Sequence, residues 1–178
     1  VVLGEEAHST IFAGLKYLGF GERNIVRVPV DSEGAMLIGA FAEAMARISG
    51  PVIVIAQAGH INSGAFDPFI AIANAVKAKG AWLHIDGAFG LWAAASPATR
   101  HLTAGVEQAD SWAVDGHKWL NVPYDSGLAF VRDAAALRAS FSIRAAYLVH
   151  ATELDPMDHT PESSRRARGI EVWAALRS

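Results

Sequence analysis

Lys118 is the residue whose type and position point most directly to chemistry. It follows a short apolar run, 111–114, that is typical of a buried strand, and the pair Asp115 and Gly116 in between favours a turn. Its sequence neighbours are mostly apolar, so we expect its amine to be largely removed from water. Burial lowers the pKa of a lysine, and the neutral amine can attack a carbonyl to form a Schiff base. The alternative is a surface lysine whose stem covers apolar atoms beside a turn.

Other polar residues share this position just past a predicted strand: His8, Asp86, and the loop 59–64 with His60. In a mostly parallel sheet, ligands bind beyond the carboxyl ends of the strands, so we expect these groups to gather around Lys118. A lysine and an aspartate at neighbouring strand ends suit pyridoxal phosphate. The lysine holds the aldehyde, and the carboxylate keeps the pyridine nitrogen protonated so that the ring accepts electrons from a substrate. His8 would lie flat on one face of that ring.

The composition favours a globular protein that acts on a small molecule. The chain has 178 residues, 52% of them hydrophobic and 19% charged, which suits a single domain with a sizeable core. A net charge of -3 without a basic run argues against nucleic-acid and membrane partners. The absence of cysteine excludes disulfides and thiolate zinc sites, agrees with a reducing, cytoplasmic location, and leaves us expecting no metal site. No apolar stretch approaches the ~20 residues of a membrane span, and the glycine-rich dinucleotide and triphosphate motifs are missing.

Apolar spacing predicts strands that alternate with helices. Strands are expected at 1–3, 24–30, 51–56, 81–85, 111–114 and 127–131. Helices are expected at 9–18, 36–48, 69–79, 104–109 and 133–141. Asp67 and the proline after it are expected to cap the helix at 69–79. This alternation is typical of an α/β fold, with a mostly parallel sheet flanked by helices.

The two ends of the sequence indicate a piece of a longer protein. The chain opens in a predicted strand, 1–3, and stops inside a helical pattern, 169–178, that has no C-cap. We therefore expect that neighbouring strands are missing, and that 1–3 or an adjacent strand forms an unpaired sheet edge.

Several segments together resemble one known family. The segments are His84-Ile-Asp86-Gly-Ala88-Phe-Gly90, Asp115-Gly-His117-Lys118-Trp-Leu120, Glu6-Ala-His8-Ser9, Gly64-Ala-Phe-Asp67 and Ser164-Arg-Arg-Ala-Arg168. In this order they resemble the pyridoxal-phosphate-dependent amino-acid decarboxylases of the aromatic-amino-acid and glutamate decarboxylase group. The resemblance covers nearly the whole chain. It implies that 1–178 is the central part of an aspartate aminotransferase-like large domain, without the upstream segment that cradles the cofactor phosphate and without the C-terminal small domain.

The resemblance also implies a role for particular residues. Lys118 matches the Schiff-base lysine, Asp86 the partner of the pyridine nitrogen, and His8 the histidine stacked on the cofactor ring. Ala88 matches the residue packed on the opposite ring face, and His117 matches a contact on the phosphate side. Each position also has a structural alternative, such as a turn residue for Asp86 or part of an N-cap turn for His8.

The remaining polar residues are left without a firm role. His60 stands where relatives often carry a small hydroxyl residue near the substrate. Asn62 and Ser63 suit a hydrogen bond to the cofactor and a turn equally well. Three further histidines are expected to be structural or on the surface: His84, His101 and His150.

The resemblance implies decarboxylation of an L-amino acid to an amine and carbon dioxide by a homodimer, and it does not identify the amino acid. In many relatives a loop tyrosine reprotonates the substrate carbon, but the matching segment, 154–162, has none. His159 is therefore a candidate proton donor, in its own site or that of the partner subunit, and a solvated loop residue is the alternative. Aldehyde formation by oxidative deamination, transamination and a non-catalytic fragment stay open.

Overall fold

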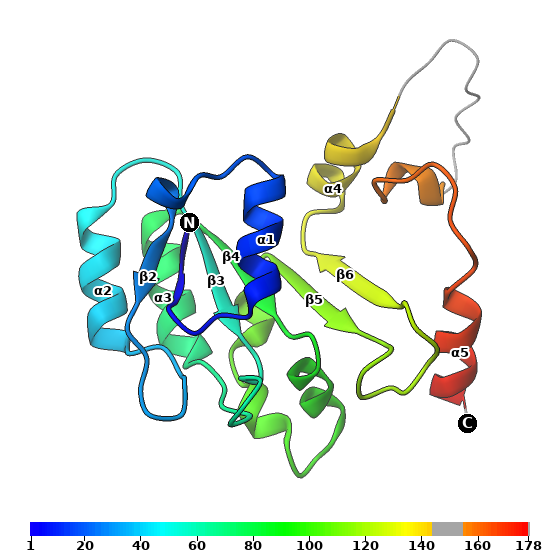
Figure 1. Cartoon of the computed structure of the whole chain (residues 1–178), viewed down its shortest axis with the longest axis horizontal. Helices are drawn as coiled ribbons and strands as arrows, with labels where there is room; N and C mark the ends of the chain where they lie inside the picture. The colour runs from blue at the N-terminus through cyan, green and yellow to red at the C-terminus, as the bar shows by residue number, and fades with distance from the viewer. Residues whose placement is uncertain (144–154, 178) are drawn as a thin grey trace.

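The computed structural model describes residues 1–143 and 155–177 of the chain (Figure 1). The strands are β1 (Val2–Gly4), β2 (Val26–Val28), β3 (Ile53–Gln57), β4 (Trp82–Asp86), β5 (Ser111–Asp115) and β6 (Gly127–Val131). The α-helices are α1 (Ser9–Tyr17), α2 (Ile38–Arg47), α3 (Phe69–Lys79), α4 (Ala134–Phe141) and α5 (Gly169–Arg177). Short 3-10 helices are η1 (Glu22–Asn24), η2 (Gly90–Ala95), η3 (Arg100–Thr103), η4 (Val106–Gln108) and η5 (Pro156–Asp158).

The strands form one six-stranded sheet in the order β2-β1-β3-β4-β5-β6. Strands β1 to β5 run parallel, and β6 returns antiparallel beside β5. This confirms the predicted α/β fold with a mostly parallel sheet. Of the two alternatives expected for the sheet edge, the strand at 1–3 is interior, because β1 pairs with both β2 and β3, and Val2 and Leu3 are fully buried. The adjacent strand, β2, forms the edge. Within the described residues the edges are β2 and β6.

Helices cover both faces of the parallel part of the sheet. Helices α2 and α3 bury Phe41, Phe69 and Ile72 against one face, which includes Val54 of β3. Helix α1 buries Leu15 against the other face, and α1 lies on the opposite side of the sheet from α3 in Figure 1. Successive strand residues point to opposite faces, so a strand covered on both sides is expected to be apolar, as residues 53–56 of β3 are.

Most element bounds differ from the sequence expectations by only one or two residues, and two elements differ more. The strand expected at 24–30 is shortened to β2, because the chain first makes η1. The helix expected at 104–109 is reduced to the single 3-10 turn η4, which begins after Gly105 at a φ of 97°. Helix α3 has the expected bounds and ends at Gly80 in the left-handed conformation that favours glycine.

Asp67 does not cap α3, contrary to expectation. The helix has no side-chain cap hydrogen bond at its N-terminus. The carboxylate of Asp67 instead accepts hydrogen bonds from the backbone nitrogens of Met36 and Gln57, both at 2.7 Å. Burial explains the difference, because a buried carboxylate needs nearby donors and these two backbone groups converge on it.

No helix in residues 1–143 or 155–177 is both long and apolar enough to cross a membrane. In the same residues no group of three or more histidine and acidic side chains could hold a metal ion.

Candidate active site

The parallel strands bring Asp86 and Lys118 to the same edge of the sheet. Gln57, Asp86 and Ala113 are in register on β3, β4 and β5, so the carboxyl ends of these strands lie side by side. Asp86 is the last residue of β4, and Lys118 lies in the turn that follows β5. The predicted placement of the aspartate and the lysine at neighbouring strand ends is confirmed.

The surroundings of Lys118 differ from the expected apolar burial. Its Nζ lies 3.1 Å from Oδ2 of Asp115, and the side chain is 35% exposed. The amine also lies 5.9 Å from the ring centroid of Phe89, which packs against Trp119. Trp119 is itself 60% exposed, so the apolar residue next to the lysine does not cover it. The expectation of a largely buried amine is therefore wrong for this chain.

The two carboxylate oxygens of Asp86 have different surroundings. One closes a turn, and the other accepts no hydrogen bond in the described part of the chain. Its Oδ1 accepts a hydrogen bond from the backbone nitrogen of Ala88 at 3.2 Å, which closes the turn after β4. The carbonyl of Ala88 accepts a hydrogen bond from the backbone nitrogen of Asp115 at 2.8 Å. This bond ties the turn after β4 to the end of β5, so Asp86 and Lys118 are held on connected backbone.

His117 is anchored within its own turn. Its Nδ1 lies 2.9 Å from the backbone nitrogen of Ser126 and 2.8 Å from its carbonyl oxygen. Its ring packs on Tyr124 with 3.9 Å between centroids, and its Nε2 lies 3.7 Å from Oδ2 of Asp115. These contacts hold the turn that carries Lys118, and a phosphate contact for His117 stays a prediction.

His8 lies at the same sheet edge but has a local hydrogen-bonding role. It is the N-cap of α1, where its Nδ1 accepts a hydrogen bond from the backbone nitrogen of Thr10 at 3.3 Å. The hydroxyl of Thr10 lies 2.8 Å from the same ring nitrogen. Among residues 1–143 and 155–177, no hydrogen bond or ion pair joins His8 to Asp86 or Lys118. The N-cap turn is thus observed, and stacking on a cofactor stays a prediction.

His159 lies away from Lys118 of the same chain. It follows η5, which packs against α4 through the ion pair between Arg138 and Asp158 at 2.9 Å. Helix α4 follows the antiparallel strand β6, so it lies at the end of the sheet opposite the turn that holds Lys118 (Figure 1). Residue 154 of the loop 154–162 lies outside the described residues.

Of the remaining histidines, His84 and His101 agree with the structural and surface roles expected for them. His84 is mostly buried on β4 beside the hydroxyl of Ser111, at 2.8 Å, and burial lowers its pKa while the charge of Asp86 opposes that shift. His101 is exposed on η3, and His150 lies outside the described residues.

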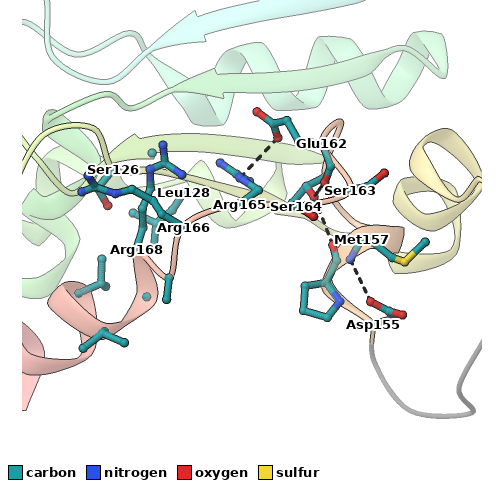
Figure 2. A pocket seen from close by; sticks show the side chains of 17 residues that line it. Ser126, Leu128, Asp155, Met157, Glu162, Ser163, Ser164, Arg165, Arg166 and Arg168 are labelled. Carbon is teal, nitrogen blue, oxygen red and sulfur yellow. Dashed lines mark hydrogen bonds and ion pairs between the residues drawn. The ribbon is translucent and has the colours of Figure 1, made fainter.

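A pocket of about 860 Å³ opens between the start of β6 and the segment 155–172 (Figure 2). Three arginines line it, each with an acidic partner: Arg165 with Glu162 at 3.4 Å, Arg166 with Glu171 at 3.9 Å, and Arg168 with Asp125 at 2.8 Å. The hydrogen bond from Arg168 lowers the pKa of Asp125. The residues that line this pocket do not include Lys118, Asp86 or His8, but they include Ser126, which holds His117, so the pocket borders the candidate site.

Sequence reasoning missed three contributors to the site. The sequence around Asp115 indicates a turn, and an acid three residues before a lysine across a turn is also a signal for an ion pair. Phe89 was noted only inside a motif, and it packs beneath the lysine. The pair formed by Glu6 and His60, with 3.1 Å between Oε2 and Nε2, joins distant parts of the sequence and has no local signal.

Comparisons with known proteins agree with this arrangement. The chain is 31% identical over 186 residues to the aromatic-L-amino-acid decarboxylase of Bacillus atrophaeus, covering 99% of this chain and 39% of that protein. It is 33% identical over 190 residues to tryptophan decarboxylase 1 of Oryza sativa subsp. japonica, covering 100% of this chain and 37% of that protein. Among solved structures, Oryza sativa TDC with PLP and tryptamine matches with a TM-score of 0.91 and 30% identity, over 99% of this chain and 38% of that one.

A second solved structure, mouse CSAD, matches with a TM-score of 0.90 and 30% identity, over 99% of this chain and 38% of that one. This chain therefore spans less than two fifths of the length of each relative. The family described as the pyridoxal-dependent decarboxylase conserved domain matches all of residues 1–178. Together with the parallel sheet and the lysine and aspartate at neighbouring strand ends, this match shows that the chain belongs to the pyridoxal-dependent decarboxylase family.

Proposed function

We propose that this chain is part of an enzyme that uses pyridoxal phosphate to decarboxylate an L-amino acid to an amine and carbon dioxide. The observation that carries the proposal is the placement of Lys118 and Asp86 at the ends of adjacent parallel strands, in a chain that belongs to this family. Relatives are named for decarboxylation of aromatic amino acids, 2,4-diaminobutyrate, aspartate and cysteine sulfinic acid. Because these substrates differ in charge and size, the proposal extends to an L-amino acid and no further.

The residues present fit the cofactor. When bound, pyridoxal phosphate supplies an aldehyde that an amine can hold and a ring that accepts electrons. Lys118 offers a primary amine that is partly open to solvent, and Asp115 beside it holds that amine in place by charge. Asp86 offers a carboxylate oxygen, free of hydrogen bonds from the described residues, that can keep a proton on the pyridine nitrogen.

The other predicted contacts complete the proposed site. Ala88 presents a small side chain next to Asp86, where a flat ring can approach closely. His8 is proposed to lie on the other ring face, and His117 on the phosphate side. These side chains would hold the cofactor in one orientation while the carboxyl group of the substrate leaves as carbon dioxide and a proton takes its place.

The context of the chain is also proposed. We infer that 1–178 is the central part of a cofactor-binding large domain, which is supported by coverage of under two fifths of its relatives. A homodimer is supported by the exposed aromatic side chains of Trp119 and Tyr124 beside the lysine turn. A cytoplasmic location is supported only by a composition without cysteine.

Covalent labelling tests the proposal. The whole protein is loaded with pyridoxal phosphate, reduced with borohydride, digested and mapped by mass spectrometry. We expect the pyridoxyl group on Lys118, and we expect Lys118→Ala to lose it. A label on Lys16, Lys77 or Lys79 would reject the assignment, and a whole protein that shows no cofactor absorbance would favour a non-catalytic relative.

An aldehyde-forming reaction is a second candidate function. Two observations favour it: the segment 155–162 contains no tyrosine, and Rhodiola rosea 4-hydroxyphenylacetaldehyde synthase matches with a TM-score of 0.84 and 28% identity. Product analysis with a panel of amino acids separates the candidates. Amine and carbon dioxide indicate simple decarboxylation, whereas aldehyde, ammonia and carbon dioxide indicate the oxidative reaction. A keto acid without carbon dioxide indicates transamination.

A further inference from the structure

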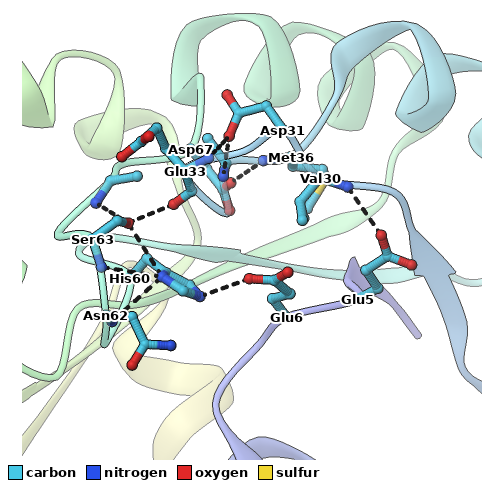
Figure 3. Close-up of polar contacts among 12 residues, drawn as sticks. Glu5, Glu6, Val30, Asp31, Glu33, Met36, His60, Asn62, Ser63 and Asp67 are labelled. Atoms are coloured by element: carbon cyan, nitrogen blue, oxygen red, sulfur yellow. Dashed lines mark hydrogen bonds and ion pairs between the residues drawn. The ribbon is translucent and has the colours of Figure 1, made fainter.

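Three loops at the carboxyl edge of the sheet are joined by polar contacts (Figure 3). They are the turn 5–8 between β1 and α1, the loop 29–37 between β2 and α2, and the loop 58–68 between β3 and α3. His60 lies between them and is 4% exposed. Its Nε2 lies 3.1 Å from Oε2 of Glu6, a side chain that is 53% exposed.

The contacts of His60 favour one position for its ring proton. The backbone nitrogens of Asn62 and Ser63 each lie 3.4 Å from Nδ1 and can only donate. These two donors favour Nδ1 as an acceptor, and we assign the tautomer in which the hydrogen is on Nε2 and points at the carboxylate of Glu6. The hydroxyl of Ser63 also lies 3.2 Å from Nδ1. Figure 3 shows the ring in this position, with Glu6 on one side and Asn62 and Ser63 on the other. Removing Glu6 would leave a buried N–H group without its acceptor.

The ring of His60 is packed closely against the loop 29–37. A Cβ atom on Gly34 would lie 2.7 Å from Cδ2 of His60, so the backbone of Gly34 packs directly on the ring. The hydroxyl of Ser63 donates to the carbonyl of Glu33 at 2.5 Å and holds the same two loops together. The N–H group of His60 therefore has a fixed position, and this position sets where the Glu6 carboxylate lies when it accepts the hydrogen bond.

The loop that carries His60 is fixed to the candidate site. The backbone nitrogen of Ala58 donates to the carbonyl of Asp86 at 2.8 Å. A Cβ atom on Gly59 would lie 2.5 Å from Cε2 of Phe89, whose ring lies beneath the amine of Lys118. Glu6 lies two residues before His8, within the turn that precedes α1. The pair formed by Glu6 and His60 therefore connects the turn of His8 to the backbone that carries Asp86 and Lys118.

We infer that Glu6 and His60 are positioning residues that set where His8 lies relative to Asp86 and Lys118. This inference rests on the proposed function, because its consequence is the affinity for pyridoxal phosphate. The buried N–H group of His60 selects the position of Glu6, and the short turn transmits that position to His8. The pair acts through His8 and has no contact of its own with the cofactor.

A double-mutant cycle in the whole protein tests the inference. The variants are Glu6→Ala, His8→Ala and the double variant, and the dissociation constant for pyridoxal phosphate is measured by titrating each apoprotein and following visible circular dichroism. We expect Glu6→Ala to weaken binding about tenfold, and to change it less than about twofold when His8 is already alanine. Glu6→Gln keeps an acceptor for Nε2–H and should recover most of the affinity. Glu5→Ala is the matched control, because the Glu5 carboxylate instead accepts from the backbone of Val30.

Hydrogen exchange of the apoproteins gives a second readout that needs no cofactor. Peptides covering 4–12 should exchange faster in Glu6→Ala than in the wild type, and at the wild-type rate in Glu5→Ala. Equal weakening by Glu6→Ala in both His8 backgrounds, or unchanged exchange, would overturn the inference and leave the proposed function intact. A wild-type protein that takes up no cofactor would instead reject the proposed function, and this inference with it.

Discussion

The carboxylates of Asp86, Asp115 and Asp67 lie in three different surroundings at the same edge of the sheet. Asp115 pairs with a lysine, and Asp86 closes a turn with one oxygen and leaves the other without a donor in the described residues. Asp67 is buried, and each of its oxygens accepts a backbone N–H group. These surroundings suit Asp115 to positioning the lysine, Asp86 to chemistry and Asp67 to structure.

Asp86→Asn should impair turnover more than cofactor binding. A neutral amide cannot hold the pyridine nitrogen protonated by charge, whereas attachment at Lys118 does not depend on that charge. We expect kcat to fall by about 100-fold or more, with the absorbance spectrum of bound cofactor still recognisable. Steady-state kinetics and a visible spectrum of the same sample check this. Glu43→Gln, on the exposed side of α2, is the control, and near-normal turnover of Asp86→Asn would leave Asp86 as a turn residue.

Asp67 should make stability depend on pH. Burial raises its pKa from 3.8 to about 6, with a smaller contribution from the charge of Asp31, while the hydrogen bonds from Met36 and Gln57 oppose the shift. The folded state therefore binds the proton of the Asp67 carboxyl group more tightly than the unfolded state does. The contribution of this protonation to stability is full below about pH 4 and is lost as the pH rises through about 6. The pKa difference corresponds to about 3 kcal/mol.

Urea unfolding of the wild type and Asp67→Asn between about pH 4 and 7.5 measures this contribution. We expect the difference in free energy of unfolding, wild type minus variant, to decrease through this range and then level off. Asp31→Asn should move the decrease to lower pH, because it removes a charge that raises the pKa of Asp67. A difference that does not change with pH would contradict the prediction.

At the scale of single residues, the sequence predicts that a residue lies at a strand end but does not predict how its side chain is oriented. The meeting of Asp86 and Lys118 was predictable, because carboxyl ends of adjacent parallel strands share an edge. The exposure of Lys118 was not, because it depends on how Asp115 and Trp119 turn in the folded loop. The contact between Glu6 and His60 was also beyond reach, since it requires two loops to meet in space.

At the scale of elements, predictions succeeded where a long local pattern decides the structure. Helix α3 has the predicted bounds, because its apolar spacing continues to a glycine that can adopt φ of 64°. The interior position of β1 was missed, because strand order depends on crossovers between distant segments. The capping role expected for Asp67 failed for the same reason, since its donors come from other elements.

The position of η5 beside α4 leads to a prediction about His159. In its own chain this residue lies at the end of the sheet opposite Lys118, so the proposed role as proton donor would be carried out in the partner subunit's site of the proposed homodimer. We expect His159→Phe to reduce amine and to increase aldehyde and ammonia in the presence of oxygen, because slower protonation of the substrate carbon leaves time for oxidation.

Mixed dimers distinguish a donor that acts in the site of its own subunit from one that acts in the site of the other subunit. Subunits carrying Lys118→Ala are combined with subunits carrying His159→Phe, and product ratios are measured by chromatography. A donor that acts across the dimer should restore the wild-type ratio at the site with an intact lysine, and a donor in the same chain should not. An unchanged ratio in the His159→Phe homodimer would show that His159 is a solvated loop residue.

At the scale of the whole molecule, the described residues leave apolar surface and sheet edges uncovered. Trp119, Tyr124 and Trp173 are 60%, 75% and 66% exposed. Strands β2 and β6 each pair on one side only among the described residues. Relatives more than twice as long supply further polypeptide that could cover such surfaces.

We therefore expect residues 1–178, produced alone, to aggregate and to lack activity even if the whole protein is an active enzyme. Exposed aromatic side chains associate in water, and unpaired strand edges template pairing with other chains. Light scattering after size-exclusion chromatography measures the association, and cofactor absorbance with product analysis measures function, with the whole protein as the control. A soluble, cofactor-loaded and active monomer of this length would contradict the prediction. It would mean that the uncovered aromatic residues and strand edges are tolerated in water, and that the lysine and aspartate at the strand ends suffice for the chemistry.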